Sequence, residues 1–135
     1  MSQDDVDIAR RLLHAWSRRD VDSAIDLLHE DIEWRPALTA GSLEGTVYRG
    51  PDGVRAWFRE LDDVWAELSY EIDEVRDVGE GRVVMLGHFH AVGRESGVTI
   101  DQPQGFVFTM VGGRVARALS LASQQDALEA AGLQE

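Results

Sequence analysis

The stretch 83–110 constrains the fold most, because it reads as two long strands that fold back on each other. Apolar and polar residues alternate on both sides of the turn Arg94-Glu95-Ser96-Gly97, as in the two strands of a hairpin. Successive side chains of a strand point to opposite faces, so the position of the turn determines which residues share a face. With the turn centred on Glu95 and Ser96, the predicted cross-strand pairs are Met85 with Phe106, Gly87 with Gln104, His88 with Pro103, Phe89 with Gln102, and His90 with Asp101.

Helical periodicity dominates the chain before this hairpin. The clearest pattern begins at Pro51, a residue suited to the first turn of a helix, and keeps the spacing i, i+3, i+4, i+7 as far as Leu68. Asp20 can cap a shorter helix that begins at Val21. The predicted helices cover residues 2–17, 21–28 and 51–68, with a short strand at 31–35 that stops at Pro36 and a loop or loose hairpin at 37–48.

The elements after residue 68 are mainly strands. They are predicted at 69–78, on both sides of the central turn, and at 114–122, before a terminal helix at 124–131. Helices followed by a run of strands indicate an α+β fold with helices packed on one face of a sheet. We therefore predict one domain over residues 1–135, a conical, curved antiparallel sheet whose concave face is covered by three helices. Such a cone encloses a cavity.

Composition excludes several functions. The chain has no cysteine and therefore no disulfide or thiolate metal site, and all 13 basic residues are arginine, which excludes lysine Schiff-base chemistry. A net charge of −12 argues against binding to nucleic acid or to an anionic membrane surface. No apolar run approaches the roughly 18–20 residues that span a bilayer, and the acidic N-terminus is unlike a signal peptide. We expect a cytoplasmic protein that interacts with neither nucleic acid nor membrane.

Five motifs carry a family resemblance that covers nearly the whole chain. They are RRDVD at 18–22, YRGPDGV at 48–54, GRESG at 93–97, DQP at 101–103 and DALEAAGL at 126–133. In these motifs the chain resembles the SnoaL-like branch of the nuclear-transport-factor-2-like (NTF2-like) superfamily. The resemblance implies a cystatin-like conical α+β barrel, often dimeric through the outer face of its sheet. The superfamily includes isomerases, cyclases, epoxide hydrolases and proteins without a known reaction, so fold alone does not specify activity.

The resemblance also orients the hairpin. In similar ketosteroid isomerases the positions of Phe106 and Phe108 line the pocket, and the predicted register adds the residues that share their face. The predicted ligand-binding residues are Leu12, Trp16, Trp34, Trp57, Phe58, Met85, Phe89, Gln104, Phe106, Phe108 and Ser120, with Ala118 and Ala122 on the same side of the last strand. Such an aromatic lining suits a small hydrophobic molecule held by one or two hydrogen bonds. Val107, Val115, Leu119 and Leu121 would form an outer apolar patch that supports a homodimer.

Acid–base candidates are few. Isomerases of this fold carry a base, an acidic oxyanion donor and a tyrosine where this chain has Pro36, Gln104 and Leu12, which disfavours steroid isomerisation. His88 and His90, with Asp101 opposite, resemble an oriented general base, although the register turns both histidines to the outer face. No metal site and no cofactor are predicted, because no third ligand accompanies the histidines.

Three functions remain open at this point. The first is a SnoaL-like pocket protein that binds a hydrophobic ligand, with Gln104 as its main polar contact. The second is a cyclase or isomerase that acts on a polycyclic or terpenoid-like substrate through His88 or His90. The third is a non-catalytic dimerisation module whose cavity is filled by its own side chains.

Overall fold

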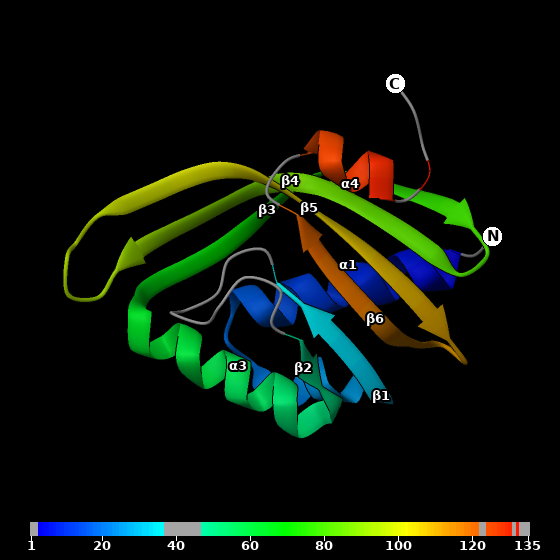
Figure 1. Ribbon diagram of the computed structural model, residues 1–135, viewed down its shortest axis with the longest axis horizontal. Helices are drawn as coiled ribbons and strands as arrows, with labels where there is room; N and C mark the ends of the chain where they lie inside the picture. The colour runs from blue at the N-terminus through cyan, green and yellow to red at the C-terminus, as the bar shows by residue number, and fades with distance from the viewer. Residues whose placement is uncertain (1–2, 37–46, 122–123, 131, 133–135) are drawn as a thin grey trace.

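The computed structural model describes residues 3–36, 47–121, 124–130 and 132, and it has the predicted α+β architecture (Figure 1). The elements, in chain order, are α1 (Gln3–Ser17), α2 (Val21–Asp26), β1 (Leu28–Arg35), β2 (Tyr48–Arg49), α3 (Gly50–Val64), β3 (Trp65–Gly79), β4 (Arg82–Gly93), β5 (Thr99–Val111), β6 (Arg114–Leu121) and α4 (Gln124–Ala130). Six strands form one curved sheet in the order β2-β1-β6-β5-β4-β3. Neighbouring strands are antiparallel except β1 and β6, whose parallel pairing was not predicted.

Helices α1, α2 and α3 lie on one side of the sheet, where the large aromatic core forms (Figure 1). Asp20 caps α2 as predicted, since its carboxylate accepts a hydrogen bond from the Ser23 amide at 3.2 Å. The helix is shorter than predicted, however: it ends at Asp26, and Leu28 is the first residue of β1. A short strand, β2, is present at Tyr48–Arg49, at the end of the stretch predicted as a loop or loose hairpin; residues 37–46 of that stretch lie outside the described residues.

The end of α3 also differs from the prediction. The apolar spacing continued to Leu68, but the helix ends at Val64 and Trp65 begins β3. Arg94 provides the physical reason, because its guanidinium group donates to the carbonyl oxygens of Asp62 at 2.9 Å and Trp65 at 3.1 Å. Carbonyl groups at a helix end lack intrahelical donors, and this arginine from the hairpin turn supplies them. The hairpin therefore terminates the helix.

Helix α4 lies on the outer face of the sheet, opposite the other helices (Figure 1). Its Ala127 and Leu128 pack there with Val84, Leu86 and Val107. Val107, Leu119 and Leu121 lie on the outer face as predicted, but Val107 is buried in this second core and the two leucines pack against it as partly buried residues. Val115 corrects the prediction, because it is fully buried in the main core. The register between β5 and β6 shifts at Thr109 and Met110, and this irregularity turns Val115 to the inner face.

Gly87 allows β3 and β4 to approach closely where the sheet bends. The register between these strands shifts between Ile72 and Glu74, directly opposite Gly87. A β-carbon at position 87 would lie 2.0 Å from the carbonyl oxygen of Glu71 and 3.0 Å from the Tyr70 ring. Because shifts of this kind bend a strand, the missing side chain contributes to the curvature that makes the sheet conical.

Candidate functional site

The inner face of the hairpin is arranged as the sequence predicted. All five predicted cross-strand pairs are present, and no register shift interrupts the pairing of β4 with β5. The predicted inward residues of the three central strands are buried, from Met85 and Phe108 at 0% exposed to Ser120 at 7%. Ala118 is also buried, while Ala122 lies outside the described residues. The register, and therefore the facing of the hairpin, is confirmed.

The helices and β1 contribute the rest of the predicted lining. Leu12, Trp16, Trp34, Trp57 and Phe58 are all at least 97% buried. The aromatic rings stack around Trp57, whose ring centre lies 6.0 Å from that of Trp16 and 4.9 Å from that of Trp34. Phe106 continues the cluster, 6.2 Å from Trp16 and 5.4 Å from Phe108. Residues from four elements thus form one aromatic cone.

This cone is nearly filled by its own side chains. The enclosed cavity measures about 10 Å³, roughly what one water molecule needs. The cone therefore does enclose a cavity, but a very small one, because the tryptophan and phenylalanine rings occupy most of the interior. The cavity is lined by Trp16, Pro36, Trp57, Leu61, Phe89, Gln104, Phe106 and Ser120.

Gln104 and Ser120 form the polar part of the cone. Apart from tyrosine and tryptophan, they are the buried polar side chains of the described residues. The Gln104 amide nitrogen donates to the Ser120 hydroxyl oxygen, and the Tyr70 hydroxyl donates to the Gln104 main-chain carbonyl at 2.6 Å. Burial, with a further contribution from the Asp73 carboxylate, raises the pKa of Tyr70 far above its ordinary value, so this hydroxyl stays protonated.

Four buried polar atoms at the cone have no hydrogen-bond partner in the described part of the chain. They are the indole nitrogens of Trp16, Trp34 and Trp57 and the side-chain oxygen of Gln104. Buried polar groups are nearly always paired, and leaving one unpaired costs about 1–3 kcal/mol. Rotating the side-chain amide of Gln104 by 180° would exchange the positions of its oxygen and nitrogen but would not pair both atoms. The Ser120 hydroxyl group can donate to the oxygen or accept from the nitrogen, and the other atom stays without a partner. The cone thus holds unused hydrogen-bonding capacity.

Tyr70, Pro36 and Leu61 belong to this site but were missing from the predicted lining. Tyr70 pairs with Phe89 across β3 and β4, so the two side chains share the inner face. Extending the alternation from the hairpin to the preceding strand would have identified it. Leu61 lies on the apolar face of α3, and helical spacing alone does not show which residue of such a face reaches a cavity.

The candidate acid–base residues lie on the outer face of the sheet, away from Gln104. His90 Nδ1 is 3.2 Å from the Asp101 carboxylate, as the predicted pairing implied, whereas His88 Nδ1 is 2.9 Å from Asp73. Both histidine side chains are more than 40% exposed. The structure therefore brings His90 and Asp101 together but places none of these candidates at the cone. Among the described residues, no three histidine or acidic side chains group closely enough to hold a metal ion.

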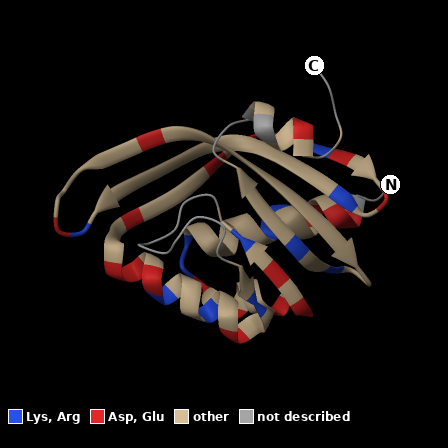
Figure 2. Cartoon of the chain, in the orientation of Figure 1, with Lys and Arg blue, Asp and Glu red and all other residues tan. Residues whose placement is uncertain are grey.

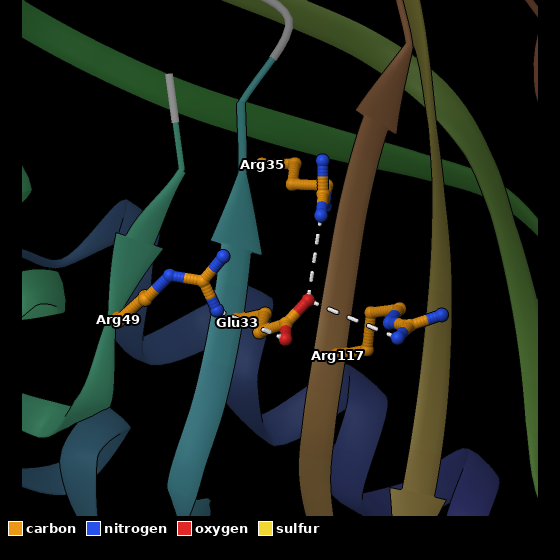
Figure 3. A network of polar contacts seen from close by, with 4 residues as sticks. All are labelled: Glu33, Arg35, Arg49 and Arg117. Atoms are coloured by element: carbon orange, nitrogen blue, oxygen red, sulfur yellow. Dashed lines mark hydrogen bonds and ion pairs between the residues drawn. The ribbon is translucent and has the colours of Figure 1, made fainter. Parts of the chain in front are cut away.

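A charged cluster marks the other end of the outer face, where Glu33 lies among three arginines (Figure 3). Its carboxylate is 3.1 Å from Arg49, 3.5 Å from Arg35 and 3.8 Å from Arg117. The hydrogen bond from Arg49, together with the nearby positive charges, lowers the pKa of Glu33. The contact between Arg49 and Glu33 joins β2 to β1. In addition, no helix among the described residues is long and apolar enough to cross a membrane.

A curved sheet that wraps an aromatic cone and carries helices on its concave side defines an NTF2-like fold. Solved structures agree with this class. An NTF2-like protein of unknown function from Burkholderia pseudomallei K96243 superimposes with a TM-score of 0.79 at 24% identity, over 96% of this chain and 97% of that one. An NTF2-like protein from Burkholderia xenovorans LB400 gives 0.75 at 25% identity, over 97% of both chains.

A third similar structure is that of TerC, co-crystallised with polyporic acid. Its TM-score is 0.78 at 19% identity, over 94% of this chain and 99% of that one. The SnoaL-like domain family matches residues 9–118, so this chain belongs to the SnoaL-like family of the NTF2-like superfamily. No curated protein sequence is detectably similar to it.

Proposed function

We propose that this protein binds a flat, largely apolar small molecule inside the aromatic cone, through oxygen atoms that accept hydrogen bonds. The four unpartnered polar atoms carry the proposal, because three of them are indole N–H donors and the fourth is the side-chain oxygen of Gln104, which would accept from a ligand hydroxyl group. Ligand oxygens that accept from the indoles would remove a cost of about 1–3 kcal/mol for each group. Membership of the SnoaL-like family, and the relative co-crystallised with polyporic acid, also support a small-molecule-binding protein.

The cone must open to admit such a ligand. Binding pockets for small molecules measure about 300–1,000 Å³, whereas the present cavity measures about 10 Å³. Trp16 and Trp57 line this cavity, and their displacement would create the missing volume. Ligand binding is therefore expected to change tryptophan fluorescence. This requirement separates the proposal from the alternative of a permanently filled module, in which the rings do not move.

Binding is a better account of the site than acid–base catalysis. The described residues that line the cavity include no titratable group, since Gln104 and Ser120 are its polar members. His88 and His90 lie on the other face of the sheet, so neither reaches a ligand in the cone in this register. Gln104 would position a ligand hydroxyl group through its unpartnered oxygen, or a ligand carbonyl group once its amide is turned over, without exchanging protons with it. The cyclase or isomerase alternative would require a base that the described lining does not contain.

A homodimer through the outer face remains a prediction from the family resemblance. Helix α4 already covers the apolar centre of this face, so a partner would have to contact the remaining polar part, where the pairs His88–Asp73 and His90–Asp101 lie. Sedimentation velocity at micromolar concentration tests the prediction. Only monomer at that concentration would exclude it.

Ligand binding is tested first by native mass spectrometry of the freshly purified protein, which detects a retained small molecule. Titration with polyporic acid and with anthraquinone, followed by tryptophan fluorescence and thermal unfolding, then measures affinity. A Trp57→Phe variant, which lacks one indole donor, is expected to bind severalfold more weakly. Trp65→Phe is the matched control, because Trp65 is half-buried on β3, does not line the cavity and is not among the unpartnered indoles. Equal affinity of both variants for every compound that binds would contradict the assigned role.

A further inference from the structure

We infer a second small-molecule site, a groove between α1 and β3 that accommodates a medium-chain carboxylate. The alkyl chain would lie on the apolar floor of the groove, and the carboxylate would pair with the arginines of α1. This site lies outside the aromatic cone and does not depend on the function proposed for it.

The groove has the size and lining of a ligand site. It measures about 400 Å³, within the range of about 300–1,000 Å³ that is usual for small-molecule pockets. Leu13, Tyr70 and Ile72 form its apolar floor, and Arg10, Arg11, His14 and Ser17 complete the lining. Leu13 and Tyr70 are at least 91% buried, so the floor is part of the packed protein.

The Tyr70 side chain separates the groove from the cone, and contacts on both sides hold it in place. Its main-chain amide donates to the Ser17 hydroxyl oxygen at 3.1 Å, which joins β3 to the end of α1. Its hydroxyl group donates to the Gln104 main-chain carbonyl on the cone side, and its ring packs edge-on against Phe106 with the ring centres 5.1 Å apart. Because these contacts fix Tyr70 to α1 and to the cone, the groove does not need a ligand to stay open.

The charges at the rim indicate an anion. The chain has 25 acidic and 13 basic residues, yet Arg10 and Arg11 have no ion pair with any described residue, whereas eight of the other eleven arginines do. Figure 2 shows the arrangement along α1, with acidic residues at its start and arginines in later turns. The helix dipole acts within the first and last turns, so it accounts for the acidic residues at the start of α1 but not for Arg10 and Arg11, which border an apolar groove in the middle of the helix.

A carboxylate with an alkyl chain matches both features. Guanidinium groups bind carboxylates with two parallel hydrogen bonds, and the floor offers apolar surface for a chain. A polyanion is a poorer match, because the net charge of −12 repels it and the acidic residues Glu71, Asp73 and Glu74 lie on the same strand as the floor. The geometry therefore favours one negative charge attached to a hydrophobic body.

Isothermal titration with butyrate, octanoate, decanoate and decanol tests this inference. Affinity for the carboxylates is expected to rise about fourfold per added methylene group until the groove is filled, and decanol should bind more weakly than decanoate. The double variant Arg10→Gln/Arg11→Gln should weaken decanoate binding by about three- to tenfold. The control is Arg59→Gln/Arg114→Gln, which removes two exposed arginines outside the groove and changes the net charge equally.

Amide NMR shifts locate the bound decanoate, and they should concentrate at α1 and β3 and persist in a Gln104→Leu variant. Three results would overturn the inference. The first is no decanoate binding at millimolar concentration. The second is equal weakening in the control variant, which would show that only net charge matters. The third is loss of binding in Gln104→Leu with unchanged binding in the α1 variant, which would place decanoate in the cone. Failure of the cone proposal is measured separately, by Trp57→Phe with aromatic ligands.

Discussion

Replacing the polar pair of the cone by apolar residues should stabilise the protein while it weakens ligand binding. Among the described residues, the buried side-chain oxygen of Gln104 has no hydrogen-bond partner, and its side-chain nitrogen is paired with Ser120. The double variant Gln104→Leu/Ser120→Ala removes the unpaired atom and both members of the hydrogen bond. Removing both partners of a buried hydrogen bond is nearly neutral, whereas an unpaired group costs about 1–3 kcal/mol. The expected gain is therefore about 1–3 kcal/mol.

This gain can be measured by thermal or urea unfolding. With an unfolding entropy of about 2.1 cal/mol/K per residue, 1 kcal/mol corresponds to roughly 3.5 °C for 135 residues, so Tm should rise by about 4–10 °C. The single variant Ser120→Ala is the matched comparison, because it leaves the whole Gln104 amide unpaired. It should lower stability by about 1–3 kcal/mol. The two variants are thus expected to differ in sign.

Ligand affinity should change in the opposite direction from stability. The double variant lacks the polar contact proposed for the ligand, so a compound that binds the wild type should bind at least about tenfold more weakly, equivalent to about 1.4 kcal/mol. A double variant that is less stable than the wild type would refute the claim that the Gln104 oxygen is unsatisfied. A more stable variant with unchanged affinity would refute the ligand-binding role and leave the stability argument intact.

Three other substitutions test the architecture around the site. Gly87→Ala should destabilise the fold by about 3 kcal/mol or more in urea unfolding, because its β-carbon would lie 2.0 Å from the Glu71 carbonyl oxygen. The control is Gly79→Ala, which should cost only about 1–2 kcal/mol, because φ is +84° there and nothing would lie within 4 Å of the new β-carbon. Equal costs at the two positions would contradict the crowding argument. Arg94→Ala should lower stability by about 1–2 kcal/mol and speed amide hydrogen exchange at the end of α3, and unchanged exchange there would argue against its capping role. Glu33→Gln should lower Tm at pH 7, because folding lowers the pKa of this carboxyl group and the ionised group therefore stabilises the protein at pH values above its ordinary pKa of 4.5. The difference in Tm from wild type should vanish as the pH falls well below 4.5. A difference that persists in acid would exclude the electrostatic explanation.

Several elements could be predicted from the sequence because their signals are local. The alternation in 83–110 and the position of its turn are sufficient to predict the register of β4 and β5, and each pair is observed. Asp20 identified the start of α2 in the same way, since a capping residue acts within one helical turn. The aromatic residues of the cone followed from the register, once the family resemblance had assigned one face to the interior.

Other features depend on contacts between distant parts of the chain. The apolar spacing around Trp65 fits both a helix and a strand, and Arg94, far along the chain, decides where α3 ends. The apolar residues on the outer face suggested an open patch, yet Ala127 and Leu128 of α4 cover it, and a short helix carries no local signal for the face on which it docks.

The sequence by itself determined the class of fold, the register of the central hairpin and the aromatic character of the cone, because side-chain alternation and turn position are properties of neighbouring residues. Only the tertiary structure decided that the cone is almost full, that four of its polar atoms lack partners within the described part of the chain, and that a larger groove lies between α1 and β3. These properties depend on how side chains from separate helices and strands fill one shared volume, and no local pattern in the chain specifies that volume.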